Sequence, residues 1–181
     1  MKSCLRLVLS AVAALTVAAA PVPAGTGPGA AAPTLAYAFS IRVTLAPPVE
    51  VGNFDGERRR FIAITGGTIS GPRLQGEVLP GGGDWQSILP GGLTRLDARY
   101  FLKAGDGTVI EVANPGVRTA SPEVIERIAE GENVDPALYY FRTTPSFRVA
   151  GEQFAWMQRS VFVARGIRRP KSVEIDFYLV E

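Results

Sequence analysis

Two short polar stretches hold the side chains best suited to chemistry in this chain. Asp84 and Trp85 follow a run of glycines, and Asp97 and Arg99 come soon after them. A carboxylate can move a proton, and an arginine can stabilise the negatively charged oxygen that such a transfer creates. We therefore take Asp97 and Glu77 as candidate catalytic residues, and Arg99 as a candidate anchor for a carboxylate, enolate or phenolate.

These residues also have structural explanations that the sequence leaves open. Asp97 and Arg99 lie two positions apart, so they share one face of the expected strand, while Tyr100 faces the other side. An exposed ion pair would contribute at most about 1 kcal/mol to stability, whereas a buried pair would orient a ligand. Trp85 either packs over an end of the fold or forms an aromatic wall beside a polar opening.

Two further segments offer polar groups with more than one explanation. Arg142 lies in the aromatic stretch 139–143 and needs a partner if it is buried. Asn114 begins the sequence Asn114-Pro115-Gly116, which predicts a turn whose side-chain amide caps the local backbone.

The composition excludes several familiar kinds of site. There is no histidine, and the only cysteine is Cys4. Ser-His-Asp hydrolysis, histidine acid–base catalysis and most zinc or non-haem iron sites are therefore excluded. The acidic residues lack calcium-loop spacing, and the glycines at 66–71 lack the Lys-Ser/Thr ending of a phosphate loop. We expect no metal and no cofactor, and we interpret those glycines as a bend in a strand pair.

The N-terminus has the order of a secretory signal peptide. The basic start MKSCLR precedes the apolar run LVLSAVAALTVAAA, and small residues and prolines follow. This order predicts a signal peptide over residues 1–24, with Ala24 as the favoured cleavage site and Ala20 and Ala32 as competitors. Residues 25–33 are expected to form a flexible Ala/Gly/Pro leader. We predict a periplasmic or secreted protein without a stable membrane anchor after cleavage, and a permanent anchor is the alternative.

Removal of this segment makes the chain electrically neutral. The full sequence has 19 basic and 17 acidic residues, and the signal peptide contains Lys2 and Arg6 but no acidic residue. The remaining chain has no excess of positive charge that would favour nucleic acid. We therefore expect no nucleic-acid partner, and we interpret Arg58-Arg59-Arg60 as a solvated strand end.

Residues 34–181 have the length of one domain and show mostly the pattern of strands. Apolar residues occupy every second position from Leu35 to Leu45, which is the period of a strand with one buried face. Ser121-Pro122-Glu123 predicts the start of one short helix that ends before Gly131. Further strands are expected at 60–69, 74–79, 94–103, 108–113, 139–144, 160–168 and 172–180, with a hairpin turn at 104–107.

The first and last expected strands are long and apolar, so they would promote aggregation if they were left as open sheet edges. Closure of the sheet removes such edges. We therefore predict an all-β fold, an antiparallel closed or nearly closed β-barrel of calycin-like or allene-oxide-cyclase-like type, with one short helix. A β-sandwich is the alternative.

Several ordered segments are similar to one known family. They are GERRRFIAITGGTISGPRLQGEVLPGGGDWQ, LDARYFLKAGDGTVIEVANPGVR, YYFRTTPSF and FVARGIRRPKSVEIDFYLV. They resemble the domain-of-unknown-function family numbered 3237, also called uncharacterised protein family 0311, from about Leu35 to the C-terminus. The resemblance implies a barrel-like all-β domain of bacterial and fungal proteins, mostly without an assigned activity. It also implies a shared pocket that uses Trp85, Arg99, Asn114 and Arg142.

Three functions remain open from the sequence. The first is an exported barrel that binds a small, partly apolar ligand, with Arg99 and Arg142 on its anionic or carbonyl group and Trp85 and Tyr100 on its apolar part. The second is a cofactor-independent isomerase, cyclase or lyase that uses a carboxylate and an arginine in the same pocket. The third is a structural envelope protein without a pocket, and a homo-oligomer is compatible with all three. A filled core would favour the third, whereas a pocket carboxylate with a raised pKa would favour the second.

Overall fold

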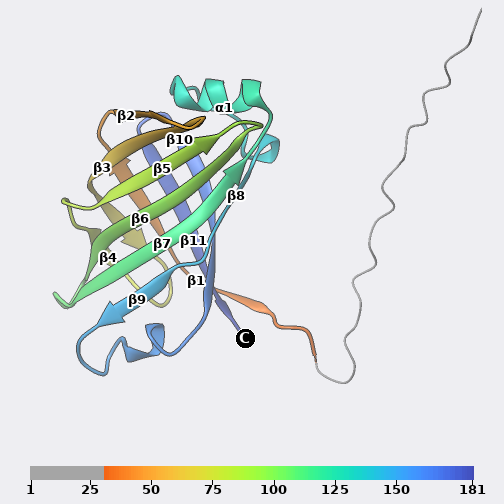
Figure 1. Ribbon diagram of the computed structural model, residues 1–181. Coiled ribbons are helices and arrows are strands. Elements are labelled where there is room, and N and C mark those ends of the chain that lie inside the picture. Colours follow the sequence, from red (N-terminus) through yellow and green to blue (C-terminus); the bar gives the residue numbers. More distant parts are fainter. Residues whose placement is uncertain (1–30) are drawn as a thin grey trace, which may run out of the picture. The chain divides into compact units, whose positions relative to one another are not determined.

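Eight antiparallel strands pair in a closed ring in the computed structural model, which describes residues 31–181 (Figure 1). Buried and more exposed residues alternate along much of each strand, because successive side chains of a strand point to opposite faces of the barrel wall. Around the ring the order is β1 (Leu35–Leu45), β3 (Glu57–Ser70), β5 (Gly83–Leu89), β6 (Leu93–Ala104), β7 (Val109–Thr119), β8 (Tyr140–Thr143), β10 (Phe162–Arg169), β11 (Ser172–Val180) and again β1.

Three shorter strands complete the sheet. β4 (Gly76–Val78) pairs with β3 and β6 beyond the reach of β5, and β9 (Ser146–Val149) pairs with the part of β7 that β8 leaves free. β2 (Val49–Phe54) pairs only with β3, and all of its residues are exposed. The interior is therefore formed by the ring. β4 continues the wall where β5 ends, and β9 continues it where β8 ends.

Short helices cover the two ends of the barrel (Figure 1). α1 (Pro122–Ala129) lies across one end, and its N-cap Ser121 Oγ accepts a hydrogen bond from a backbone N–H of the first turn. The 3₁₀ helix η2 (Ala155–Met157) lies at the other end, and η1 (Pro136–Leu138) precedes β8. Ile128 of α1 belongs to a small apolar cluster with Leu96, Val134, Tyr139 and Phe141, and Met157 of η2 belongs to the larger cluster that includes Phe39 and Phe177.

The two ends of the domain meet at the closure of the barrel. The Thr34 N–H donates to the Glu181 carbonyl at 2.8 Å, and the Glu181 N–H donates to the Thr34 carbonyl at 2.9 Å. From there β1 pairs with β11 along nearly its whole length. The predicted closed barrel and the single helix near Ser121 are therefore confirmed.

Two segments expected to be irregular are strands. Residues 83–89, where no strand was expected, form β5, and Asn114-Pro115-Gly116, expected as a turn, lies inside β7. The Pro115 carbonyl accepts a hydrogen bond from the Thr144 N–H at the break between β8 and β9. The nitrogen and the carbonyl of one residue in an antiparallel strand face the same neighbour, so the proline nitrogen also faces this break. Proline is therefore tolerated at this position. The sequence pattern also does not predict β2 and β9.

The predicted signal peptide at residues 1–24 and most of the predicted leader lie outside the described residues, so both stay predictions. Within residues 31–181, no helix has the length and apolar character needed to cross a membrane.

Candidate functional site

A small cavity lies inside the barrel and borders both apolar clusters. It has a volume of about 50 Å³, and each of the eight ring strands contributes side chains to its lining. Most of these side chains are apolar, and the polar ones are Asp84, Gln86, Tyr100, Asn114, Arg118, Thr143 and Arg168. An apolar cavity with a few converging polar groups is the usual form of a small-molecule site. The small volume restricts it to compact ligands.

Asp84 on β5 supplies the one carboxylate among the lining residues. Its Oδ2 accepts a hydrogen bond from Gln86 Nε2, whereas its Oδ1 is shielded from solvent and has no hydrogen-bond partner. Burial raises the pKa of Asp84 above its ordinary value, although the Gln86 hydrogen bond and the Arg118 charge act in the opposite direction. Other atoms of the residue retain some solvent contact. The pKa depends on the burial of the carboxylate and not on the exposure of the other atoms, because the carboxylate carries the charge.

Arg118 on β7 is a buried cation without a carboxylate partner, and its guanidinium lies 5.9 Å from the centre of the Phe141 ring. The residue is 2 % exposed, its Nε has no hydrogen-bond partner, and no carboxylate among residues 31–181 lies within salt-bridge distance of it. Burial and the charges of Arg60 and Arg168 lower the pKa of Arg118 to about 10, so it stays protonated at neutral pH. A buried charge is costly unless it is compensated. Arg118 is therefore suited to an anionic ligand group.

Tyr100 and Asn114 are the two sequence-predicted ligand residues that line the cavity. Asn114 Nδ2 donates to Tyr100 Oη at 3.2 Å, and burial raises the pKa of Tyr100, so the phenol is neutral. Asn114 Oδ1 and Thr143 Oγ1 are buried without partners. Because buried polar atoms are normally hydrogen-bonded, these two atoms are available to a ligand or a water molecule.

Two more arginines lie near the cavity. Arg60 is 4 % exposed, and its Nε donates to Gln86 Oε1 at 2.8 Å. Arg168 Nη1 donates to the backbone carbonyls of Arg169 and Ser172. Burial lowers the pKa of Arg60 and of Arg168. With Arg118, the interior holds three cations near one carboxylate.

Asp97 and Arg99 lie on the outer wall of the barrel. They form an ion pair at 3.4 Å, and their side chains are 51 % and 68 % exposed. Glu77, the other predicted proton-transfer residue, forms a similarly exposed pair with Lys103 at 3.0 Å. The explanation of Asp97 and Arg99 as a surface ion pair is therefore correct, and Glu77 is found in a pair of the same kind. All three side chains lie on the outer wall and do not line the cavity.

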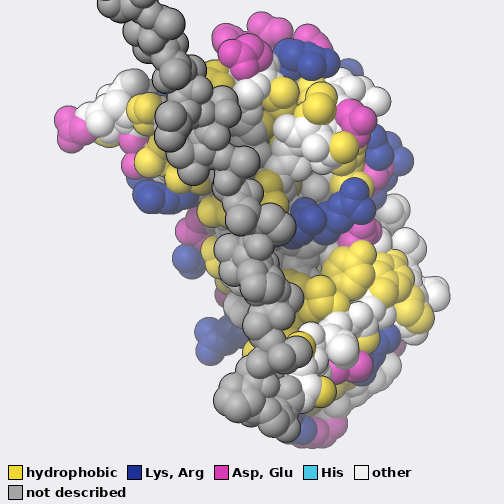
Figure 2. Space-filling view, turned by 90° about the vertical axis from the view of Figure 1, so that its right-hand side faces the viewer, with side chains coloured by type: hydrophobic (Ala, Val, Ile, Leu, Met, Phe, Trp, Pro, Cys, Tyr) yellow, Lys and Arg dark blue, Asp and Glu magenta, His cyan; other side chains and the backbone are white. Residues whose placement is uncertain are grey.

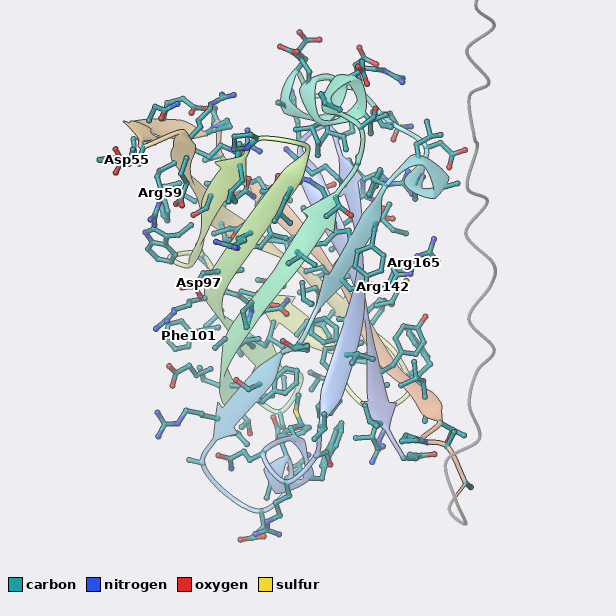
Figure 3. The ribbon with its side chains drawn as sticks, turned by 45° about the vertical axis from the view of Figure 1, so that its right-hand side comes forward. Asp55, Arg59, Asp97, Phe101, Arg142 and Arg165 are labelled. Atoms are coloured by element: carbon teal, nitrogen blue, oxygen red, sulfur yellow. The ribbon has the colours of Figure 1, made fainter. Side chains whose placement is uncertain are left out.

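Trp85 and Arg142 also face outward. Trp85 is 45 % exposed and packs on Phe61 with ring centres 4.8 Å apart, so it neither caps a barrel end nor borders the cavity. The Arg142 guanidinium lies 5.0 Å from the centre of the Tyr140 ring, and Arg165 is opposite Arg142 on β10. Figure 3 shows Arg142 and Asp97 on different outer sides of the barrel, and Figure 2 shows basic side chains on the face seen from the right of Figure 1.

The prediction that Trp85, Arg99, Asn114 and Arg142 converge on one cavity is thus wrong for three of the four. The reason is strand alternation. Arg142 lies between the inward-facing Phe141 and Thr143, and Trp85 lies between Asp84 and Gln86.

The sequence analysis missed Arg60, Gln86, Arg118 and Arg168 as interior residues. A detectable signal existed for Arg118. It lies four positions after Asn114 on the same strand, so it must share the inward face. Arg60 corrects the interpretation of the run 58–60, because only Arg58 and Arg59 are exposed there.

Within residues 31–181, no group of three or more acidic, histidine or cysteine side chains is arranged to hold a metal ion. The single carboxylate of the cavity makes it a poor metal site. Its volume is also far below the roughly 300–1,000 Å³ of pockets that hold larger organic ligands.

Comparison with known proteins confirms the family suggested by the sequence motifs. A family model described as a protein of unknown function (DUF3237) matches residues 33–180. The chain belongs to this family. A UPF0311 protein of Clostridium acetobutylicum is 41 % identical over 143 residues, which cover 78 % of this chain and 90 % of that protein.

Solved structures of relatives agree with the fold. A conserved protein of unknown function from Rhodopseudomonas palustris has a TM-score of 0.81 and 34 % identity, covering 84 % of this chain and 100 % of that chain. A protein described as β-barrel like, from Acinetobacter baumannii, has a TM-score of 0.74 and 35 % identity, covering 86 % and 100 %.

A shorter match has a named activity. A protein of Penicillium herquei called hydroalkoxylation enzyme phnH is 32 % identical over 80 residues, covering 44 % of this chain and 53 % of that protein. A structure of an enzyme from the same organism has a TM-score of 0.65 at 21 % identity, covering 86 % of this chain and 99 % of that one, which shows a shared fold.

Proposed function

We propose that this protein is a cofactor-independent enzyme that moves a proton on a compact, partly apolar substrate with a hydroxyl or carbonyl oxygen. The observation that carries the proposal is the presence of Asp84 and the unpaired Arg118 in one interior cavity. Burial raises the pKa of the Asp84 carboxylate, and a carboxylate with a raised pKa in a cavity is suited to act as a general acid or base. A structural protein without a pocket would be expected to have a filled interior.

The two residues supply complementary parts of such a reaction. Asp84 as the carboxylate takes a proton from a substrate hydroxyl, or from a carbon next to a carbonyl. Arg118 stabilises the resulting negative oxygen in a site shielded from water, where such an interaction is strongest. Asp84, now the neutral acid, returns the proton to a different carbon, which restores the starting state of the enzyme.

The name of the fungal relative suggests a specific form of this chemistry. Hydroalkoxylation adds an O–H group across a carbon–carbon double bond, so the hydroxyl proton must move to carbon while the oxygen bonds to the neighbouring carbon. One proton-transferring group and one oxyanion-stabilising group are sufficient for this sequence. We propose O–H addition as the first reaction to test, with a double-bond shift next to a carbonyl as the second.

Two compact probes in D₂O test the proposal with the full chain. 2-Allylphenol reports O–H addition through a cyclic ether, and 3-cyclohexenone reports the double-bond shift, both with new C–D bonds seen by NMR. Asp84→Asn should lower the rate by about 100-fold or more, the usual contribution of a general acid or base. Arg118→Met should lower it by a similar factor, about 100–1,000-fold.

Matched variants on the outer wall serve as controls for these effects. Asp97→Asn and Arg142→Met remove the same charges outside the cavity and should leave the rate unchanged. Binding of a probe beside Asp84 without any conversion would contradict the enzymatic proposal. The protein would then be better described as a binding protein for small anionic or carbonyl ligands.

We also propose that the protein is exported to the periplasm or secreted. The support is the sequence order at residues 1–24, with its basic start, apolar run and small residues before Gly25. N-terminal sequencing of the protein from a bacterial periplasmic fraction should give a chain that begins at Gly25. Recovery from the membrane with Met1 retained would contradict export.

A further inference from the structure

We infer that Arg60 is a positioning residue that controls the protonation of Asp84 through the side-chain amide of Gln86. Asp84 is the acid–base residue of the proposed function, so the functional meaning of this inference rests on that proposal. Its test measures Asp84 directly and needs no substrate.

The three side chains form a continuous hydrogen-bonded chain. Arg60 Nε donates to Gln86 Oε1 at 2.8 Å, and Gln86 Nε2 donates to Asp84 Oδ2. Arg60 on β3 lies directly opposite Gln86 on β5 in the strand register, and each is 4 % exposed. Water therefore does not compete for the Gln86 amide.

Arg60 fixes which way the Gln86 amide points. A guanidinium has donors but no acceptor, so only Oε1 of the amide can face it. Nε2 is then left to donate to Asp84, and a donated hydrogen bond favours the ionised carboxylate. An amide turned over by half a rotation would present Oε1 to Asp84 and would favour its protonated form. Arg60 thus selects the orientation that favours the carboxylate.

Other charged or titratable groups also face Asp84, and none of them holds the Gln86 amide. Tyr100 of β6, Arg118 of β7 and Arg168 of β10 line the same cavity. Within residues 31–181, no hydrogen bond joins these three side chains to Asp84 or Gln86. The lining residues from β1, β8 and β11 are uncharged. Arg118 and Arg168 therefore act on Asp84 by charge alone, whereas Arg60 can act through a contact.

A double-mutant cycle separates the contact from the charge. The pKa of Asp84 is measured by ¹³C NMR titration of the full chain labelled in aspartate carboxyls, with Asp84→Asn identifying the signal. We expect Arg60→Met to raise the pKa of Asp84, and Gln86→Leu to raise it as well. With Gln86→Leu already present, Arg60→Met should raise the pKa by less than half as much as it does in the unchanged background.

The control is Arg58→Met. Arg58 lies two residues before Arg60 on β3, but it is exposed and bonded to Glu50 at 2.8 Å. It should leave the titration of Asp84 nearly unchanged. Equal shifts from Arg60→Met in both backgrounds would overturn the inference, because they would show an effect of charge alone.

A measurement on the wild-type protein tests the inference even where the variants do not fold. The side-chain NH₂ signals of Gln86 should titrate together with Asp84, because Nε2 donates directly to its carboxylate. Signals that do not change as Asp84 titrates would overturn the inference. Failure of the substrate probes to react would leave this titration measurable, so the proposed activity and the role of Arg60 can fail separately.

Discussion

Arg118 carries a charge inside the barrel that no neighbouring carboxylate neutralises at contact distance. We predict that Arg118→Met raises the free energy of unfolding by about 1–3 kcal/mol, because methionine removes a desolvated charge and still fills much of the space. Urea unfolding measures this change. Arg142→Met on the outer wall should change stability by less than about 0.5 kcal/mol. A clear loss of stability in Arg118→Met would contradict this prediction and would show that the contact with the Phe141 ring outweighs the cost of burying the charge.

Asp84 should make stability depend on pH in the direction opposite to an ordinary aspartate. Its pKa is raised by burial, so the folded state binds more protons than the unfolded state above about pH 4. The stability that protonated Asp84 provides is present at acid pH and is lost as pH rises through the folded pKa. Asp84→Asn should therefore gain stability relative to the wild type as the pH rises from about 4 through the folded pKa of Asp84. Thermal unfolding at a series of pH values measures the difference, and a gap that narrows over this range would contradict the prediction.

The interior residues show what single-residue reasoning could and could not predict. Tyr100 and Arg99 are adjacent on one strand, so they cannot both face one cavity, and the burial of Tyr100 places Arg99 outside. Strict use of this alternation, starting from Tyr100 and Asn114, would have selected Arg118. The pairing of Arg60 with Gln86 could not be predicted, because it depends on the register between β3 and β5.

At the scale of the elements, Gly166 on β10 lets Phe141 of β8 lie close to its backbone. A Cβ at this position would lie 2.5 Å from the Phe141 ring, and the ring borders the cavity. We predict that Gly166→Ala lowers the free energy of unfolding by about 1–3 kcal/mol, as measured in urea, because overpacking forces the ring to move.

Gly105→Ala is the matched control for this substitution. A Cβ there would meet its nearest neighbour at 3.9 Å, and the backbone φ of Gly105 is not in the left-handed region. Little loss of stability is expected. Equal losses in both variants would show that backbone freedom, and not contact with Phe141, explains the requirement for glycine.

Elements with a clear local signal were predictable, and those set by neighbouring strands were not. The two-residue period of β1 and the Ser-Pro start of α1 predicted the first and last residues of both elements closely. β5 is short and begins in a glycine run, so its strand character depends on pairing with β3 and β6. The Asn114-Pro115-Gly116 sequence resembles a turn locally, but long pairing between β6 and β7 extends the strand through it.

At the scale of the whole molecule, the meeting of Thr34 with Glu181 predicts tolerance to circular permutation. A short Gly-Ser linker from Glu181 to Thr34, with new ends between Asp106 and Gly107, should give a barrel whose Tm lies within about 5 °C of the original. New ends between Arg165 and Gly166 would interrupt β10 and should prevent cooperative unfolding. A turn permutant without a cooperative transition would contradict this prediction.

The closed barrel followed from the sequence because two long apolar strands at the ends of the domain need partners, and pairing them with each other is the simplest solution. The position of the cavity did not follow. It depends on where the two apolar clusters stop filling the interior, which is set by packing across all eight strands.

The pairing of Thr34 with Glu181 also bears on how proteins of this kind diversify. The first residue that the closed sheet uses comes after all three candidate cleavage sites, Ala20, Ala24 and Ala32. The residues that close the wall and line the cavity therefore all lie within residues 34–181. A leader could be gained or lost in such a lineage without removing any residue of the wall or of the cavity lining.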